Sequence, residues 1–259
     1  MHDIKDFEGY VSKMDITVID KLFWLPHVTH PVTQLVDIGC ACGKLQTVFN
    51  AVSPCTELIG IEENLDMVQK IYEGYDKGEI PFIRVHGLLD DIPGKLKPGS
   101  VINMSSVLHE VYSYKNKEYI KNFWKQINRL EPEYITIRDM MWNESDAYCP
   151  TDLICNTILH SVYAKQAEEF ESKYGLLSEK KNLTHFLLKY RYKENWEREL
   201  NENYFAFSID DAIPVLNDNY KVIYHEFFAL PWTAKCARND FGISFLPGTT
   251  HQKIIYQRR

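Results

Sequence analysis

A short glycine turn between two apolar runs constrains this chain more than any other feature. Residues 35–38 (LVDI) lead into the turn 39–43 (GCACG), and a second apolar run, 58–61 (LIGI), ends at Glu62, about twenty residues farther on. Glycine lets a backbone turn tightly and approach a ligand closely. The pattern therefore predicts a βαβ unit with a ligand site at the glycine turn and with the Glu62 carboxylate beside that site.

The spacing of the glycines argues against two other nucleotide sites. The dinucleotide fingerprint G-x-G-x-x-G needs a glycine where this chain has Ala41. A phosphate-binding P-loop needs four residues between its glycines and then Lys and Ser or Thr. Here three residues separate Gly39 from Gly43, and Lys44 is followed by Leu45. A βαβ unit whose glycines only form a turn is the alternative that the pattern leaves open.

Composition bounds the class of protein. The chain has 259 residues, of which 45% are hydrophobic, so it can bury the core of one elaborated α/β domain or of two small ones. Its net charge of −7 argues against nonspecific coating of nucleic acid. We find no signal peptide and no apolar run of membrane-spanning length. The six cysteines lack framework or zinc spacing, so we expect free thiols in a cytoplasmic protein without a membrane partner.

Strand and helix patterns alternate through the first 140 residues. One or two helices are expected over 4–25. Strands are then predicted at 34–38, 57–61, 82–85, 101–105 and 134–138, and helices at 43–52, 64–75 and 117–130. Such alternation predicts a parallel sheet that is covered on both faces. The glycine turn, Glu62, Gly87, Ser105 and Asp139 would then share the carboxyl edge, where open α/β sheets bind ligands.

The pattern changes after Asp139. Residues 147–205 contain no clear strand and predict helices, for example over 153–170 and 183–200. Residues 208–211 have the form of a capping box that opens a short helix toward Leu216. Strands are predicted again at 220–228 and 252–256. The α/β pattern is therefore interrupted by a helical insert.

These motifs resemble those of the class I S-adenosylmethionine-dependent methyltransferases. Residues 36–43 resemble the first motif, D/E-x-G-x-G-x-G, with Ala41 in place of the central glycine, and 59–62 resemble the second, whose acidic residue holds the ribose. Residues 85–93 resemble the third motif, with Leu88 where an aspartate often contacts adenine. Residues 102–110 resemble the end of strand four, where a run of small residues precedes Leu-His.

The resemblance implies a doubly wound, Rossmann-like α/β sheet of seven strands in the order 3-2-1-4-5-7-6, with the last strand antiparallel. It implies a single methyltransferase domain over 1–259, a helical lid over 1–30, and a substrate-recognition insert over 147–205 between strands five and six. The implied cofactor is S-adenosyl-L-methionine. The residues expected to contact it are Asp37, Gly39, Cys40, Ala41, Gly43, Glu62, Glu63, Leu88, Leu89 and Ser105.

His109 and Glu110 are the candidate catalytic bases, because they follow strand four at the cofactor edge. A base accelerates methyl transfer to a hydroxyl or ammonium, typically by about 10²–10⁴-fold. The alternative for His109 is a helix-start residue that bonds to the backbone, and for Glu110 a solvated carboxylate favoured by the helix dipole. We expect no resident metal, because Met140 follows Asp139 where some O-methyltransferases carry an Asp-Asn pair.

Three functions are compatible with these residues. The favoured one is methyl transfer from S-adenosylmethionine to an oxygen or nitrogen of a small-molecule or sugar-like acceptor. A second is modification of RNA or DNA through the basic and aromatic residues of 185–193, with Trp196 and Arg198, although packing as an amphipathic helix is the favoured interpretation of that stretch. A third is a noncatalytic subunit that binds S-adenosylmethionine. The oligomeric state has no signature in the sequence.

Overall fold

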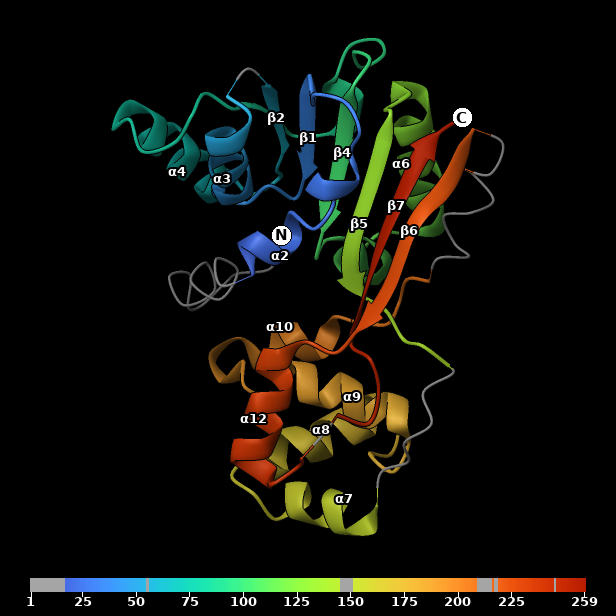
Figure 1. Ribbon diagram of the computed structural model, residues 1–259. Coiled ribbons are helices and arrows are strands. Elements are labelled where there is room, and N and C mark those ends of the chain that lie inside the picture. The colour runs from blue at the N-terminus through green and yellow to red at the C-terminus, as the bar shows by residue number, and fades with distance from the viewer. Residues whose placement is uncertain (1–16, 55, 145–150, 209–215, 217–218, 245) are drawn as a thin grey trace.

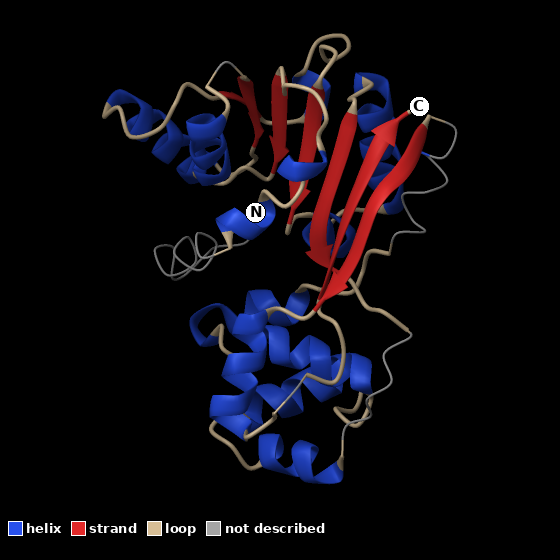
Figure 2. Ribbon diagram, viewed as in Figure 1, coloured by secondary structure: helices blue, strands red, loops and turns tan. Residues whose placement is uncertain are grey.

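The computed structural model describes residues 17–54, 56–144, 151–208, 216, 219–244 and 246–259. A seven-stranded sheet carries helices on both faces, and a group of helices lies beyond one of its ends (Figures 1 and 2). The strand order is β3-β2-β1-β4-β5-β7-β6. Only β7 runs antiparallel to its neighbours. The predicted fold class and strand order are therefore confirmed.

The strands begin and end close to the predicted positions. They are β1 (Gln34–Ile38), β2 (Glu57–Ile61), β3 (Arg84–His86), β4 (Ser100–Ser105), β5 (Tyr134–Met140), β6 (Tyr220–Phe228) and β7 (His251–Arg258). β3 begins two residues later than predicted, and only its three residues pair with β2. β5 extends two residues farther than predicted, because Asp139 and Met140 pair with the start of β7.

The helices up to residue 130 include α2 (Val18–Lys21), α3 (Lys44–Val52), α4 (Leu65–Asp76), α5 (Leu108–Tyr114) and α6 (Lys117–Leu130), with short 3-10 turns η1 (Leu25–His27) and η2 (Leu89–Asp91). Asn64 caps α4, as predicted, by accepting hydrogen bonds from the amides of Asp66 and Met67. The sequence analysis considered the start of α5 only in its alternative interpretation of His109 and Glu110 and did not predict the helix itself. The part of the predicted first helices that falls in 4–16 lies outside the described residues.

The later helices are α7 (Asp152–Leu159), α8 (Ala164–Tyr174), α9 (Lys180–Lys189), the 3-10 turn η3 (Lys193–Asn195), α10 (Trp196–Asn201) and α12 (Pro231–Phe241). The helix predicted over 153–170 is divided because Ser161 makes local bonds, donating to the Ile158 carbonyl and accepting from the Tyr163 amide. The helix predicted over 183–200 is likewise divided, at η3. α12 was not predicted, and most of the capping box at 208–211 lies outside the described residues.

Each face of the sheet has its own core. Leu35 and Leu58 face α2, α3 and α4, and Trp24 packs against Phe49 there with ring centroids 5.4 Å apart. The alternate residues of the same strands face α6, whose buried side chains include Trp124. Alternation of side chains along buried strands thus produces two cores from nearly continuous apolar runs.

A third core belongs to the helices α7, α8, α9, α10 and α12, which we call the helical subdomain. Side chains from the insert, such as Phe170 and Phe186, pack with Ala237 and Phe241 of α12. The subdomain is thus built from two separate segments, one before β6 and one between β6 and β7. It lies beyond the carboxyl ends of the parallel strands (Figure 1). Among the described residues, no helix is both long and apolar enough to cross a membrane.

Gly60 offers a test of the packing that holds the glycine turn against β2. A Cβ at this position would lie 2.6 Å from the Cys40 sulfur. We expect Gly60→Ala to lower the free energy of unfolding by about 1–3 kcal/mol, the usual cost of overpacking, as measured by urea denaturation. Adding Cys40→Ala removes the obstructing sulfur, so the double variant should lose less than the sum of the two single losses. Strict additivity would contradict this contact.

Candidate functional site

The glycine turn and the end of β2 are joined by one carboxylate. Glu62 accepts a hydrogen bond from the Ala41 amide at 2.9 Å on one oxygen and from the Asn64 amide at 2.8 Å on the other. Gly39, Ala41 and Gly43 all have positive φ angles, of 72°, 47° and 73°. Ala41 holds this conformation although it carries a Cβ, and the bond to Glu62 fixes its amide. The glycine turn and the Glu62 carboxylate, which the sequence analysis predicted to lie side by side, are therefore in direct contact.

A chain of buried polar groups runs beneath the turn. The Asn103 amide nitrogen donates to Asp37 at 2.7 Å, and the Thr136 hydroxyl donates to the Asn103 side-chain oxygen at 2.9 Å. Burial raises the pKa of Asp37 to about 6, although the bond from Asn103 opposes this rise. A small cavity of about 40 Å³ lies between this carboxylate and α2, which contributes Val18 and Lys21 to its wall.

The other residues predicted to contact the cofactor lie around the same edge of the sheet but differ in burial and in bonding partners. Cys40 is buried against Gly60, and burial raises the pKa of its thiol, so it stays neutral. Ser105 is buried at the end of β4. Glu63 points outward to an ion pair with Lys115 at 3.0 Å. The two leucines that follow β3 differ in burial: the Leu88 side chain is 45% exposed, and that of Leu89 is buried.

His109 is held by a buried aspartate at the end of β5. Its Nδ1 lies 2.7 Å from Asp139, and the other Asp139 oxygen accepts from the Val107 and Leu108 amides at 3.0 and 2.7 Å. Burial by itself lowers the pKa of His109, but the charge of Asp139 and its hydrogen bond outweigh burial and raise that pKa to about 9. The same pair lowers the pKa of Asp139 despite its burial. We infer a buried aspartate–imidazolium pair.

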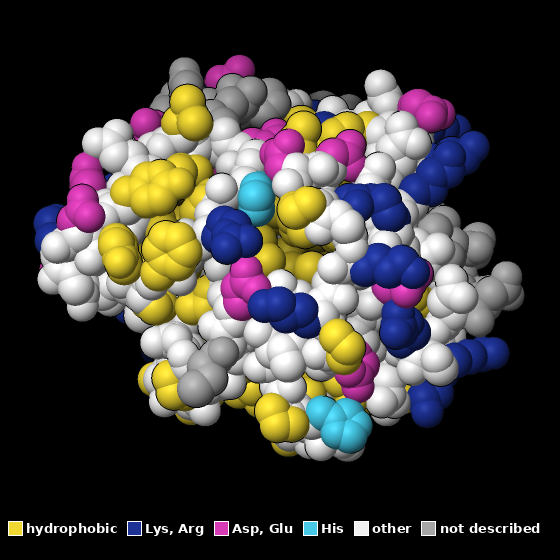
Figure 3. Space-filling view, turned by 90° about the horizontal axis from the view of Figure 1, so that it is seen from above, with side chains coloured by type: hydrophobic (Ala, Val, Ile, Leu, Met, Phe, Trp, Pro, Cys, Tyr) yellow, Lys and Arg dark blue, Asp and Glu magenta, His cyan; other side chains and the backbone are white. Residues whose placement is uncertain are grey.

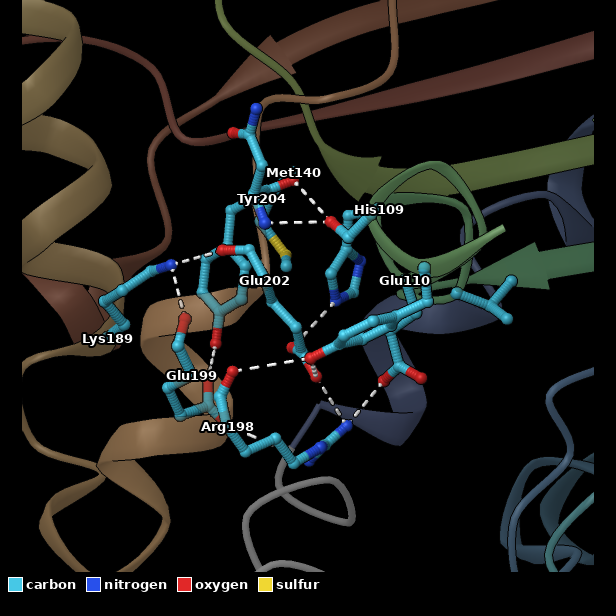
Figure 4. A network of polar contacts seen from close by, with 12 residues as sticks. His109, Glu110, Met140, Lys189, Arg198, Glu199, Glu202 and Tyr204 are labelled. Atoms are coloured by element: carbon cyan, nitrogen blue, oxygen red, sulfur yellow. Dashed lines mark hydrogen bonds and ion pairs between the residues drawn. The ribbon is translucent and has the colours of Figure 1, made fainter. Parts of the chain in front are cut away.

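The helical subdomain delivers a third charged group to this pair. Glu202, which follows α10, is almost fully buried and places one oxygen 3.9 Å from the His109 Nε2 atom. Its other oxygen accepts from the Arg198 guanidinium at 2.8 Å, and Arg198 also bonds to Glu110 at 3.0 Å (Figure 4). Burial, together with the charges of Glu110 and Glu199, raises the pKa of Glu202 to about 7. Through its bond to Arg198, Glu110 belongs to the same ion-pair network as Glu202.

Behind Glu202, a fully buried lysine fastens α9 to the end of α10. The Lys189 ammonium donates to the carbonyls of Glu199 and Glu202 at 2.7 and 2.5 Å, and it lies 4.3 Å from the centre of the Tyr204 ring. The Tyr204 hydroxyl bonds to the Glu199 carboxylate (Figure 4). These contacts fix the backbone that carries Glu202.

Donor atoms of His109, Glu110 and Glu202 all lie within 4.8 Å of one another, a spacing at which such groups hold metal ions. Arg198 already supplies positive charge to both carboxylates of this set. A metal ion would have to displace that guanidinium. The arrangement therefore serves an ion-pair network rather than a prepared metal site, and the absence of a resident metal stays a prediction.

A second cavity along this edge has a volume of about 320 Å³. It lies between the carboxyl ends of β4 and β5 and the helical subdomain, with polar and apolar residues from both. Its lining includes Ser106, His109, Arg138, Met140, Leu187, Leu188, Arg191, Glu199, Glu202, Tyr204, Trp232 and His251. Lys21 lines this cavity and also the small cavity at the glycine turn. The two cavities are therefore neighbours, joined at α2.

The sequence analysis predicted that His109 and Asp139 lie at the same edge of the sheet. It did not identify Glu202, Arg138 or Trp232 as cavity residues. Glu202 follows an acidic, helical stretch that carries no recognisable motif. Trp232 lies on α12, which was not predicted. Arg138 was recognised only as the end of a strand, and its bond to Asp20 of α2 at 2.6 Å spans 118 positions.

The basic and aromatic stretch 185–193 is largely internal. Phe186, Leu187 and Tyr190 belong to the core of the helical subdomain, and Lys189 is fully buried. Trp196 donates to Glu169 within the same subdomain. This is the amphipathic packing that the sequence analysis favoured. At the opposite end of the molecule, Lys and Arg side chains gather on one side of the surface (Figure 3). Lys95, Arg258 and Arg259 line a pocket there together with Glu131 and Glu133.

Comparison with known proteins supplies the context for this geometry. No protein-family model matches the sequence, and no curated protein matches it. A solved S-adenosylmethionine-dependent methyltransferase from Archaeoglobus fulgidus superposes with a TM-score of 0.54 at 10% identity, over 98% of this chain and 100% of that one. The chain has the fold of the S-adenosylmethionine-dependent methyltransferases. The methyltransferase domain of bacterial CtHen1-C is also similar, with a TM-score of 0.51 at 11% identity, over 94% of this chain and 97% of that one.

The pair of His109 and Asp139 predicts how this methyltransferase fold responds to pH. A histidine whose folded pKa lies above its unfolded value stabilises the fold fully below about pH 6.5 and loses this contribution as pH rises to 9. Between pH 7.5 and 9 we expect the free energy of unfolding to fall by about 1.5 kcal/mol through this residue. Urea denaturation at several pH values measures it. His109→Gln should flatten the profile, and an unchanged slope would contradict the ion pair.

Proposed function

We propose that this protein transfers a methyl group from S-adenosylmethionine to an oxygen or nitrogen atom of a small molecule held in the 320 Å³ cavity. The observation that carries the proposal is the contact between Glu62 and the glycine turn. That carboxylate uses one lone pair of each oxygen on a backbone amide, so each oxygen keeps another for a ligand hydroxyl. Paired oxygens at the end of β2 suit the two ribose hydroxyls of the cofactor.

The residues beneath the turn fit the other end of the cofactor. Asp37 lines the small cavity beside Gly39 and Ala41, and only one of its oxygens accepts the bond from Asn103. A buried carboxylate of this kind suits the ammonium of the methionine part. Exposed Leu88 offers an apolar surface at the position expected for adenine. When bound, the cofactor supplies an electrophilic methyl group on a sulfonium centre.

The chain's own residues then orient the acceptor and exclude water. The cavity is bounded by β4 and β5 on one side and by the helical subdomain on the other, so an acceptor held in it would lie between the sheet and the subdomain. Fixed placement of a nucleophile can supply several kcal/mol of rate enhancement. Met140, Leu187 and Leu188 provide apolar contacts, while His109 presents a polar atom that Asp139 holds in place. A small molecule is favoured over a nucleic acid, because the basic and aromatic stretch of the insert is internal.

The first test is calorimetric titration with S-adenosylmethionine and with S-adenosylhomocysteine. We expect both to bind the wild-type protein. Glu62→Ala should weaken binding by about 100-fold or more, because hydrogen bonds to a charged group are worth about 1.5–3 kcal/mol each. Glu57→Ala removes a carboxylate at the other end of the same strand, where it pairs with Lys97, and should leave affinity unchanged. Equal affinities for all three proteins would refute the ribose assignment.

The cofactor's affinity should also depend on pH. The pKa of Asp37 is raised to about 6 in the free protein, and a bound cation favours its charged form. Binding of the ammonium should therefore weaken by up to about tenfold for each pH unit below 6. Titrations between pH 7.5 and 5 measure this slope. Asp37→Asn keeps the shape of the side chain and should reduce the slope; a slope that is identical in the variant would assign the effect to another group.

A further inference from the structure

One atom of His109 and one atom of Glu202 lie close enough together to bond to the same small polar group in the cavity. The His109 Nε2 atom and the nearest Glu202 oxygen are 3.9 Å apart, which is too far for a hydrogen bond and short enough for one atom to bond to both. Both side chains line the 320 Å³ cavity. In Figure 4, Glu202 and His109 point toward each other across this gap.

The two residues cannot adjust this distance freely, because each is held from behind. The His109 Nδ1 atom is bonded to Asp139, which is itself bound by the amides of Val107 and Leu108. The second Glu202 oxygen is bound by Arg198 at 2.8 Å and by the Tyr114 hydroxyl at 3.2 Å. One free oxygen and one free ring nitrogen therefore face the same point.

These two atoms differ in what they demand of a ligand. Asp139 is an acceptor of several bonds, so His109 keeps a proton on Nδ1, and in its charged form it also donates from Nε2. The Glu202 carboxylate accepts. A group between them must accept one hydrogen bond and donate another. A hydroxyl does both without changing its charge. An alkylamine is protonated near neutral pH, and its ammonium form only donates and would also meet the positive imidazolium. It could accept a hydrogen bond here only after losing that proton.

We propose that His109 and Glu202 bracket a hydroxyl group, and that the methyl acceptor is therefore an alcohol or phenol whose oxygen atom is methylated. The inference rests on the proposed function and narrows its choice between oxygen and nitrogen. It also assigns a role to Glu202, a residue of the helical subdomain, so that the acceptor site is complete only when the subdomain is docked on the sheet.

The proposed step balances. The acceptor oxygen forms a bond to the methyl carbon while the bond from that carbon to the sulfonium sulfur breaks, and the sulfur keeps the electron pair. The hydroxyl proton passes to the Glu202 carboxylate. His109 donates a hydrogen bond to the oxygen and holds one of its lone pairs in position. The products are the methyl ether and neutral S-adenosylhomocysteine.

The test uses three probes of one shape: benzyl alcohol, benzylamine and ethylbenzene. They are titrated into the full chain with ¹⁵N-labelled histidine, and the His109 Nε2 resonance, assigned by its loss in His109→Gln, is followed by NMR. We expect benzyl alcohol to shift this resonance saturably and the other two probes to leave it in place. A shift from benzylamine equal to that from benzyl alcohol, or no shift from benzyl alcohol, would overturn the proposal.

The role of Glu202 is tested with two variants and a control. Glu202→Gln keeps the size of the side chain and an oxygen for Arg198, and Glu202→Asp keeps the charge but withdraws it by one methylene. Each should weaken benzyl alcohol binding by about 10- to 100-fold, with the fold checked by circular dichroism. Glu131→Gln, at the opposite edge of the sheet, should not change it. Affinities within twofold of the wild type in both Glu202 variants would remove Glu202 from the site.

These measurements are separate from the test of the proposed function, because they need no cofactor. If S-adenosylmethionine fails to bind, the proposed function falls. The NMR titration still decides whether His109 and Glu202 bind a hydroxyl group. If it binds and benzylamine alone shifts His109, methyl transfer stands and the assignment of oxygen falls.

Discussion

The buried carboxylate of Asp139 organises the carboxyl edge of the sheet. It lies at the end of β5, it accepts hydrogen bonds from the backbone at the start of α5, and it binds His109. A buried charge is tolerated only when it is paired and fully hydrogen-bonded. The requirement of this one group therefore fixes the direction in which α5 leaves β4 and the orientation of the imidazole. The cavity wall, the ion pair with His109 and the approach of Glu202 all depend on that geometry.

A second carboxylate, that of Glu62, holds backbone segments together at the other half of the edge. Glu62 ties the glycine turn to the start of α4 through the Ala41 and Asn64 amides. The turn itself needs three residues with positive φ, and close packing of Gly60 on Cys40 holds it against β2. The two carboxylates thus set the two halves of the edge independently, and α2 joins them because Lys21 lines both cavities.

The helical subdomain packs against the edge of the sheet while keeping a core of its own. Its own core, which includes Phe170, Phe186 and Phe241, lets it fold around itself. Its contacts with the sheet edge are both apolar and polar. Met140 of β5 packs with Tyr204 and Phe205, which follow α10. Arg198 also forms ion pairs with Glu110 of α5 and with Glu202. Buried polar networks specify one arrangement rather than many, because any other docking leaves charges unpaired. The ion-pair network therefore sets the position of Glu202 relative to His109.

The sequence determined what depends on short separations along the chain. Strands β1 and β2, the glycine turn, the Asn64 cap and the joining of Glu62 to that turn all follow from patterns within about thirty residues, where periodicity and turn chemistry act directly. The remaining strands were also predicted from local pattern, and their order from the family resemblance. Only the tertiary structure decided which distant side chains meet. Glu202 meets His109 from 93 positions away, and α12 joins the insert's core although β6 separates the two along the chain. Such contacts arise from packing between distant segments, and local pattern carries no record of which distant surface a side chain will meet.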